Sequence, residues 1–166
     1  MTNKENNTFL NIPLRANKQE TSRNHYIKFL PVPVCETVES CEYIVTPKRE
    51  VLVMDLLEKY SKRTVLKREL EGKERVLQFV KAFKQIPPHF EVFVWSVLDE
   101  GPVYKMNLKW VIDNFELLWN EYNKHDLTII SENGRVGLMV SEYPGYVDSS
   151  FESDEILYQV KKWGLI

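Results

Sequence analysis

The stretch Leu108–Glu142, LKWVIDNFELLWNEYNKHDLTIISENGRVGLMVSE, sets the fold class that the sequence predicts. Its first half, Leu108–Tyr122, spaces apolar residues three or four positions apart, as on the buried face of a helix. Its second half holds two strand-like segments, Leu127–Ser131 and Val136–Ser141, joined by Glu-Asn-Gly-Arg. Because Asn-Gly favours a type I′ turn, we expect a β-hairpin directly after the helix.

Upstream of this helix, the segment Phe90–Leu98 is the strongest strand candidate in the chain. It is dense in β-branched and aromatic residues, and both of its alternating faces are apolar, which predicts a central strand covered on both sides. Val103–Met106 can pair back against it, and Asn107 can cap the following helix. We therefore predict an α+β fold: a single domain with a mostly antiparallel sheet, a C-terminal hairpin and several packed helices.

Three further helices are expected from local signals. One begins after Thr46-Pro47, because proline is favoured at the first helical position. A second runs from about Val65 to Lys84, where Gly72 either interrupts it or splits it into two pieces. The last, Glu155–Trp163, has acidic residues at its start and lysines at its end, as the helix dipole favours.

Residues 1–25 are polar apart from one short apolar cluster, Phe9–Leu14. This composition predicts a flexible polar arm that can be removed without unfolding the rest, and it places the single α+β domain at residues 26–166. The Pro-Val-Pro sequence of residues 31–33 predicts an edge strand or an extended connector after Tyr26. Because the apolar runs are too short to span a bilayer and the first residues do not resemble a secretory signal, we expect a cytoplasmic protein.

The sequence contains none of the common catalytic or cofactor motifs. It has no P-loop, GxGxxG, HExxH or GxSxG sequence, and its three histidines are widely scattered. Cys35 and Cys41 do not supply the paired ligands of a structural zinc site. We therefore expect no enzyme activity, no cofactor and no metal. Free thiols are the expectation for a reducing cytosol, although a disulfide between the two cysteines is sterically conceivable.

Charge is distributed unevenly along a chain whose net charge is −2. Residues 1–86 hold 16 Lys and Arg against 11 Asp and Glu, whereas residues 87–166 hold 6 against 13. The basic half could present a phosphate-binding surface. Its candidate residues are Lys62, Arg63, Lys67, Arg68, Lys73 and Arg75. Glutamates interleave with these cations at helical spacing, so an ion-paired, solvated face is the alternative.

The acidic half carries tyrosines among its carboxylates near the C-terminus. The candidate partner-binding residues are Glu142, Tyr143, Tyr146, Asp148 and Glu152. Tyrosine supplies anchoring contact area and the acids steer a basic partner protein, which is the chemistry that an inhibitor of a cationic protein requires. In the alternative interpretation, the tyrosines pack on the hairpin and the acids begin the last helix.

A resemblance to a known class of proteins supports the binding interpretation. The helix Leu108–Tyr122, then Asp-Leu-Thr-Ile-Ile-Ser, Glu-Asn-Gly and Val-Gly-Leu-Met-Val-Ser-Glu-Tyr, resembles the C-terminal part of small bacterial immunity-type proteins, over about a third of the chain. The resemblance implies a small, acidic, cytoplasmic protein that neutralises a cognate toxin by binding it. We therefore expect a non-enzymatic, protein-binding module of immunity or inhibitor type. The alternative is a nucleic-acid-associated accessory protein of a mobile element that uses the Lys/Arg-rich helices.

Overall fold

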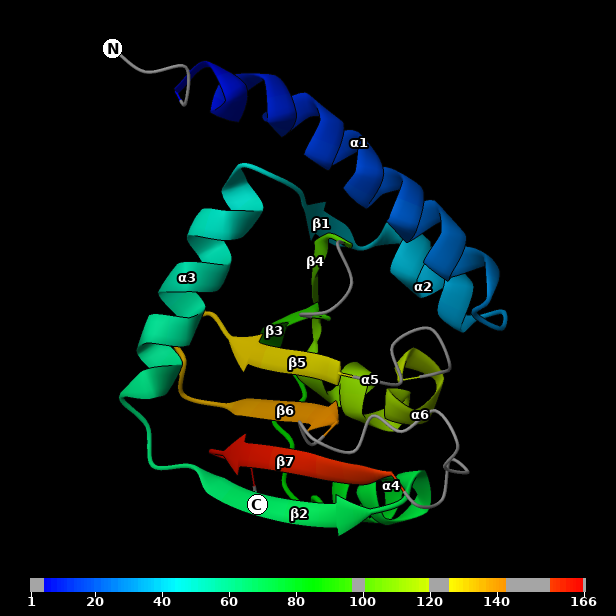
Figure 1. The fold of residues 1–166 in the computed structure, drawn as a ribbon. Coiled ribbons are helices and arrows are strands. Elements are labelled where there is room, and N and C mark those ends of the chain that lie inside the picture. The colour runs from blue at the N-terminus through cyan, green and yellow to red at the C-terminus, as the bar shows by residue number, and fades with distance from the viewer. Residues whose placement is uncertain (1–4, 97–100, 120–125, 143–155, 166) are drawn as a thin grey trace.

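An antiparallel sheet of seven strands forms the centre of the protein (Figure 1). The computed structural model describes residues 5–96, 101–119, 126–142 and 156–165, with side chains from Ile12 onward. The strands are β1 (Glu42–Ile44), β2 (Leu66–Glu71), β3 (Glu91–Trp95), β4 (Val103–Asn107), β5 (Asp126–Ser131), β6 (Gly137–Glu142) and β7 (Leu157–Trp163). They follow the order β1-β4-β3-β5-β6-β7-β2, and every neighbouring pair is antiparallel.

Helices lie against both faces of this sheet. They are α1 (Glu5–Lys28), α2 (Val34–Ser40), α3 (Lys48–Ser61), α4 (Lys73–Lys81), α5 (Leu108–Asp113) and α6 (Phe115–Leu118). Among the described residues, none of these helices is long and apolar enough to cross a membrane. Helices and an antiparallel sheet in one domain confirm the predicted α+β class.

The alternation of apolar residues along β3 builds two cores. Phe93 and Trp95 face α3, whose Leu56 is fully buried in the same cluster. Val92 and Val94 belong to the larger core on the opposite face, to which α4, α5, α6 and the C-terminal part of α1 contribute. The prediction of a central strand covered on both sides is therefore confirmed for β3, in which every residue except Glu91 is buried.

The helix predicted over Leu108–Tyr122 is divided. Asn107 caps its start as expected, with the side-chain oxygen accepting from the Trp110 N–H at 3.0 Å. Asn114 separates α5 from α6, and its side-chain amide donates to the Trp110 carbonyl at 2.9 Å, an interaction that competes with continued helix. The expectation of one continuous helix is wrong, and its last residues, 120–122, lie outside the described residues.

The hairpin that follows is confirmed, but its turn differs from the prediction. Strands β5 and β6 pair as expected, with Ile129 opposite Leu138. Gly134 has a φ of 65°, whereas no described residue other than glycine has a positive φ, so a type I′ turn is wrong. The five-residue connection between β5 and β6 closes instead with the Gly134 N–H donating to the Ser131 carbonyl at 2.8 Å. Connections of this length do not need a positive φ at Asn133.

Two segments expected to be helical form strands. Leu66–Glu71 is β2, and only the residues after Gly72 become a helix, α4. Leu157–Trp163 is β7, with Tyr158 and Val160 buried on one face and Trp163 buried on the other. The two segments pair with each other along the whole length of β2. Backbone hydrogen bonding between segments far apart in sequence therefore outweighed the local helical signals.

The expectation of a flexible polar arm over residues 1–25 is wrong where the structure describes side chains, from Ile12 onward. The segment belongs to α1, and its Gln19 is only 5% exposed. The Gln19 amide donates to Thr46 Oγ1 at 2.9 Å and accepts from the Thr46 N–H at 2.8 Å. Arg23 donates to the Glu39 carbonyl at 2.6 Å, so polar side chains that suggested an arm tie α1 to the domain. Tyr26 continues this helix, which corrects the expected edge strand.

Candidate functional site

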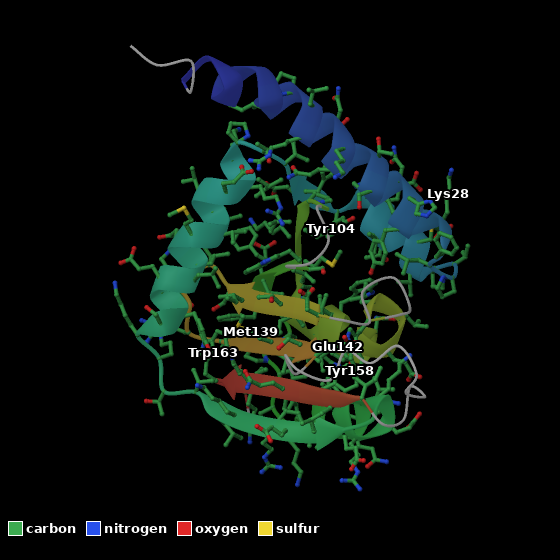
Figure 2. The ribbon with its side chains drawn as sticks, viewed as in Figure 1. Lys28, Tyr104, Met139, Glu142, Tyr158 and Trp163 are labelled. Atoms are coloured by element: carbon green, nitrogen blue, oxygen red, sulfur yellow. The ribbon has the colours of Figure 1, made fainter. Side chains whose placement is uncertain are left out.

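Of the five acidic and tyrosine candidates, only Glu142 lies in the described part of the chain. It is the last residue of β6 and stands opposite Tyr158 of β7 (Figure 2). Burial, with a smaller contribution from the Glu142 carboxylate, raises the pKa of Tyr158 to about 12. Tyr143, Tyr146, Asp148 and Glu152 lie outside the described residues, so the acidic partner surface stays a prediction.

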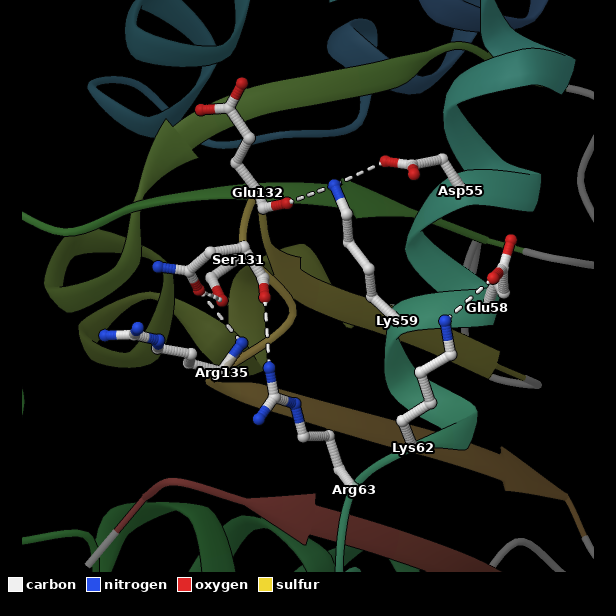
Figure 3. A network of polar contacts seen from close by, with 9 residues as sticks. Asp55, Glu58, Lys59, Lys62, Arg63, Ser131, Glu132 and Arg135 are labelled. Carbon is white, nitrogen blue, oxygen red and sulfur yellow. Dashed lines mark hydrogen bonds and ion pairs between the residues drawn. The ribbon is translucent and has the colours of Figure 1, made fainter.

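The six basic candidates do not form one surface. Lys62 pairs with Glu58 at 2.8 Å, and Arg63 donates to the Asn133 carbonyl at 3.4 Å. The Lys62–Glu58 pair lies at the end of α3, whereas the Arg63 contact belongs to a network that ties this end of α3 to the turn between β5 and β6 (Figure 3). At its centre, Lys59 Nζ lies 2.6 Å from Asp55 and 3.0 Å from the Glu132 carbonyl. Lys62 and Arg63 are exposed, but each is already in contact with an oxygen acceptor of this chain, which makes them weaker candidates for a phosphate-binding surface.

The remaining four basic candidates lie around the outer edge of the sheet. Lys73 and Arg75 are in the first turn of α4. Lys67 and Arg68 are in β2, which is a strand and not part of a Lys/Arg-rich helix as expected. Successive side chains of a strand point to opposite faces, so Lys67 and Arg68 diverge.

Strand β7 brings two lysines that the sequence analysis had placed at the end of a helix. Lys161 stands directly opposite Lys67, and Lys162 stands opposite Leu66. The sheet edge made by β2 together with these two lysines is called the basic edge below. It is the feature that sequence reasoning missed, and the alternation of polar and apolar residues in Leu157–Trp163 was the signal for it.

The register decides how closely the two facing lysines approach. Beyond the last ladder pair, the Gly72 N–H donates to the Ile156 carbonyl at 2.9 Å. Because hydrogen-bonded and non-hydrogen-bonded pairs alternate, Lys67 and Lys161 form a non-hydrogen-bonded pair, in which side chains are closest. No carboxylate of the described residues lies within ion-pair distance of either ammonium group. Like charges opposite each other destabilise a sheet, and a bound anion would relieve this repulsion.

The opposite face of the basic edge combines cations with aromatic rings. The Arg68 guanidinium lies over the Phe79 ring at 5.5 Å, and Lys162 Nζ lies over the Phe83 ring at 5.0 Å. Phe79 and Phe83 pack edge to face, with their centroids 5.4 Å apart. The four residues form a cation–aromatic patch between α4 and the sheet, and the rings hold the two cations in place.

The outer backbone of β2 is a second feature of this edge. Because hydrogen-bonded and non-hydrogen-bonded pairs alternate between β2 and β7, the backbone N–H and C=O groups of Lys67, Glu69 and Glu71 point away from β7. Beyond these groups, the described part of the sheet has no further strand. Every residue of β2 except the half-buried Leu70 is exposed, so the edge is accessible along its whole length.

The described residues do not form a metal centre. Among them, no group of three or more His, Cys, Asp or Glu side chains is placed to hold a metal ion. Cys35 and Cys41 are both free thiols. Burial, the largest influence on the Cys41 thiol, raises its pKa to about 11, which opposes formation of the nucleophilic thiolate.

Comparison with known proteins places almost the whole chain in a family. The model of the YokC prophage protein family matches residues 1–162. The chain belongs to this family. It is also 30% identical, over 162 residues, to the SPbeta prophage-derived uncharacterized protein YokC of Bacillus subtilis strain 168. That match covers 92% of this chain and 94% of the B. subtilis protein. Membership of the YokC family connects the chain with prophages and assigns it no reaction.

Proposed function

We propose that this YokC-family protein is a non-catalytic binding module of inhibitor type, which takes an extended segment of a partner protein onto the outer edge of β2. The observation that carries this proposal is the row of outward backbone groups at Lys67, Glu69 and Glu71. An extended peptide can add to such a row as a further strand, with backbone hydrogen bonds supplying affinity and alternate side chains supplying specificity.

The charges on the basic edge indicate which side chains the bound segment of the partner protein should carry. Lys67 and Lys161 flank the edge on one face, and Arg68 flanks it on the other. Acidic side chains of an added strand would meet these cations and relieve the repulsion between the two lysines. Glu69 and Glu71 follow at one end of β2, so the acidic residues of the segment belong opposite Lys67 and Arg68. The proposed partner surface is thus acidic, in contrast to the basic partner expected from the sequence.

Backbone substitution tests strand addition directly. The probe is a displayed library of random peptides of about eight residues, from which binders to the parent chain are selected and resynthesised. We expect acidic, β-branched sequences that bind the parent, lose binding to Glu69→Pro and keep binding to the matched control Glu69→Ala. Proline removes only an outward N–H at this position, so the sheet should remain intact by circular dichroism. Failure to select such peptides, or equal binding to both variants, contradicts the proposal.

Charge substitution on the basic edge tests separately whether the bound peptide contacts it through acidic side chains. Replacing Lys67 and Lys161 together by Glu should weaken binding of the selected peptides by at least about tenfold and reverse the dependence on salt. The control replaces Lys28 and Lys48, which are exposed and lie away from the basic edge, by Glu. Similar affinities for the two double variants would show that the acidic residues of the peptide do not meet the basic edge.

A second candidate function is association with nucleic acid, and the cation–aromatic patch favours it. Arg68, Phe79, Phe83 and Lys162 combine two cations with two aromatic rings, and binders of single-stranded nucleic acid use such side chains for phosphates and bases. Fluorescence anisotropy with a single-stranded oligonucleotide of about 12 nucleotides at several salt concentrations tests it. Micromolar binding at about 150 mM salt that Arg68→Glu abolishes and Glu69→Pro preserves would replace the peptide proposal by this one.

A further inference from the structure

A cleft of about 360 Å³ lies between α4 and the pair α5–α6, on the face of the sheet opposite α3. Its volume falls within the range of small-molecule sites in proteins. Six apolar side chains line it: Leu77, Val80, Phe83, Ile86, Ile112 and Phe115. Five charged side chains also line it: Lys81, Lys84, Lys109, Asp113 and Glu116.

The apolar wall of the cleft is preformed. Val80 is fully buried and Phe115 is 2% exposed, so both are held by the larger core. Phe83 and Ile86 are half-buried and pack against this core at the end of α4 and in the segment after it. A ligand that covers these two side chains would remove apolar surface from water without rearranging the helices, which favours binding of an apolar group.

Among the described residues, the charged side chains of the cleft leave one cation without an ion-pair partner. Lys81 pairs with Glu116 at 3.1 Å, and Lys109 pairs with Asp113 at 2.7 Å, so both carboxylates that line the cleft are neutralised. Lys84 has no carboxylate within ion-pair distance among the described residues. Within the described part of the chain, the cleft therefore joins an apolar wall to one uncompensated positive charge.

We propose that this cleft binds a small amphiphile that carries one apolar chain and one carboxylate. The apolar chain lies along Phe83, Ile86 and Ile112, and the carboxylate lies near the Lys84 ammonium group. The volume of the cleft fits a single medium-length chain, and the unpaired cation selects an anionic head group over a cationic one. The cleft shares Phe83 with the cation–aromatic patch, but no residue of β2 lines it, and it does not depend on the function proposed for the edge of β2.

The test uses two probes with the same apolar chain and opposite charge. The full chain is titrated with sodium decanoate and with decyltrimethylammonium, each below its critical micelle concentration, and amide chemical shifts are followed by NMR. We expect saturable shifts for decanoate, confined to residues of α4, α5, α6 and the segment 82–86 after α4, and binding of the cationic probe at least about tenfold weaker. Equal binding of the two probes, or shifts that do not saturate or lie outside the cleft, would overturn the proposal.

Two variants and a matched control complete the test. Lys84→Glu replaces attraction by repulsion and should weaken decanoate binding by about tenfold. Lys48 is also exposed but lies on α3, away from the cleft, so Lys48→Glu should leave decanoate binding unchanged. Ile86→Trp should fill the cleft and abolish binding while the amide spectrum of the rest of the protein is preserved. Unchanged decanoate affinity in both Lys84→Glu and Ile86→Trp would show that the ligand binds elsewhere.

Discussion

Gly137→Ala should be one of the most destabilising single-methyl changes in this protein. Gly137 of β6 stands directly opposite Trp163 of β7, and the indole ring lies across the glycine. A Cβ atom at this position would be 2.5 Å from Trp163 Cε2 and closer still to Cζ2 and Cη2. Carbon atoms in contact are normally about 3.5–4.0 Å apart, so the ring must move by more than about 1 Å.

The surroundings of the indole set the magnitude. Trp163 is 4% exposed, its Nε1–H donates to the Gly134 carbonyl at 3.0 Å, and its ring lies 4.6 Å from that of Tyr60. Overpacking costs about 1–3 kcal/mol, and loss of the indole hydrogen bond adds about 1 kcal/mol. We therefore expect a loss of about 2–4 kcal/mol in the free energy of unfolding. For a chain of this length, that lowers the Tm by roughly 5–15 °C.

Urea and thermal denaturation followed by circular dichroism measure this loss. Ser141→Ala is the control, because Ser141 is half-exposed on the same face of β6, and it should cost less than about 0.5 kcal/mol. In a Trp163→Leu background, Gly137→Ala should become nearly neutral, since the ring that it displaces is absent. A Gly137→Ala variant that melts within about 1 °C of the parent would refute the placement of the indole over Gly137.

Three other outcomes follow from described contacts. Gly134→Val should cost about 2–4 kcal/mol in urea denaturation, because the φ of 65° strains a β-branched residue and its Cβ would lie 2.6 Å from Lys59 Cβ; a parent-like midpoint contradicts this. Gln19→Ala should lower the free energy of unfolding by about 1–3 kcal/mol in the same assay, since the buried Thr46 N–H loses its acceptor. An unchanged stability would instead support the expectation that residues 1–25 form a flexible arm. Burial raises the pKa of Cys41 from 9.0 to about 11, so its contribution to stability is complete below pH 9 and is lost as the pH rises toward 11; Cys41→Ala should remove that part of the pH dependence.

The parts of the fold that the sequence predicted correctly are those with local signals. Both faces of β3 are apolar in the sequence, and burial on both faces needs no knowledge of its neighbours. The hairpin of β5 and β6 joins strands that are adjacent in sequence, so the glycine at 134 and the apolar segments on either side sufficed. The turn geometry was missed because the same Asn-Gly pair also fits a connection in which only Gly134 has a positive φ.

The errors arose where a partner far along the chain supplied what the local sequence lacked. In α1, Gln19 and Arg23 look like solvated residues, but both are buried, where Gln19 forms two hydrogen bonds with Thr46 and Arg23 donates to the Glu39 carbonyl. The residues of β2 were expected to begin a helix from about Val65 to Lys84, whose apolar stripe lies after Gly72, and pairing with β7 made them a strand instead.

The sequence by itself determined the α+β class, the central strand β3 and the hairpin, because burial and turn chemistry act over a few neighbouring residues. Only the tertiary structure decided the basic edge. Lys67 and Lys161 are 94 positions apart in the sequence, and they face each other because antiparallel pairing of β2 with β7 fixes their register. The cleft beside α4 arises in the same way, from the packing of helices that lie on either side of β3 and β4 in the chain. Local sequence sets which side chains are charged or apolar, and long-range pairing sets which of them meet.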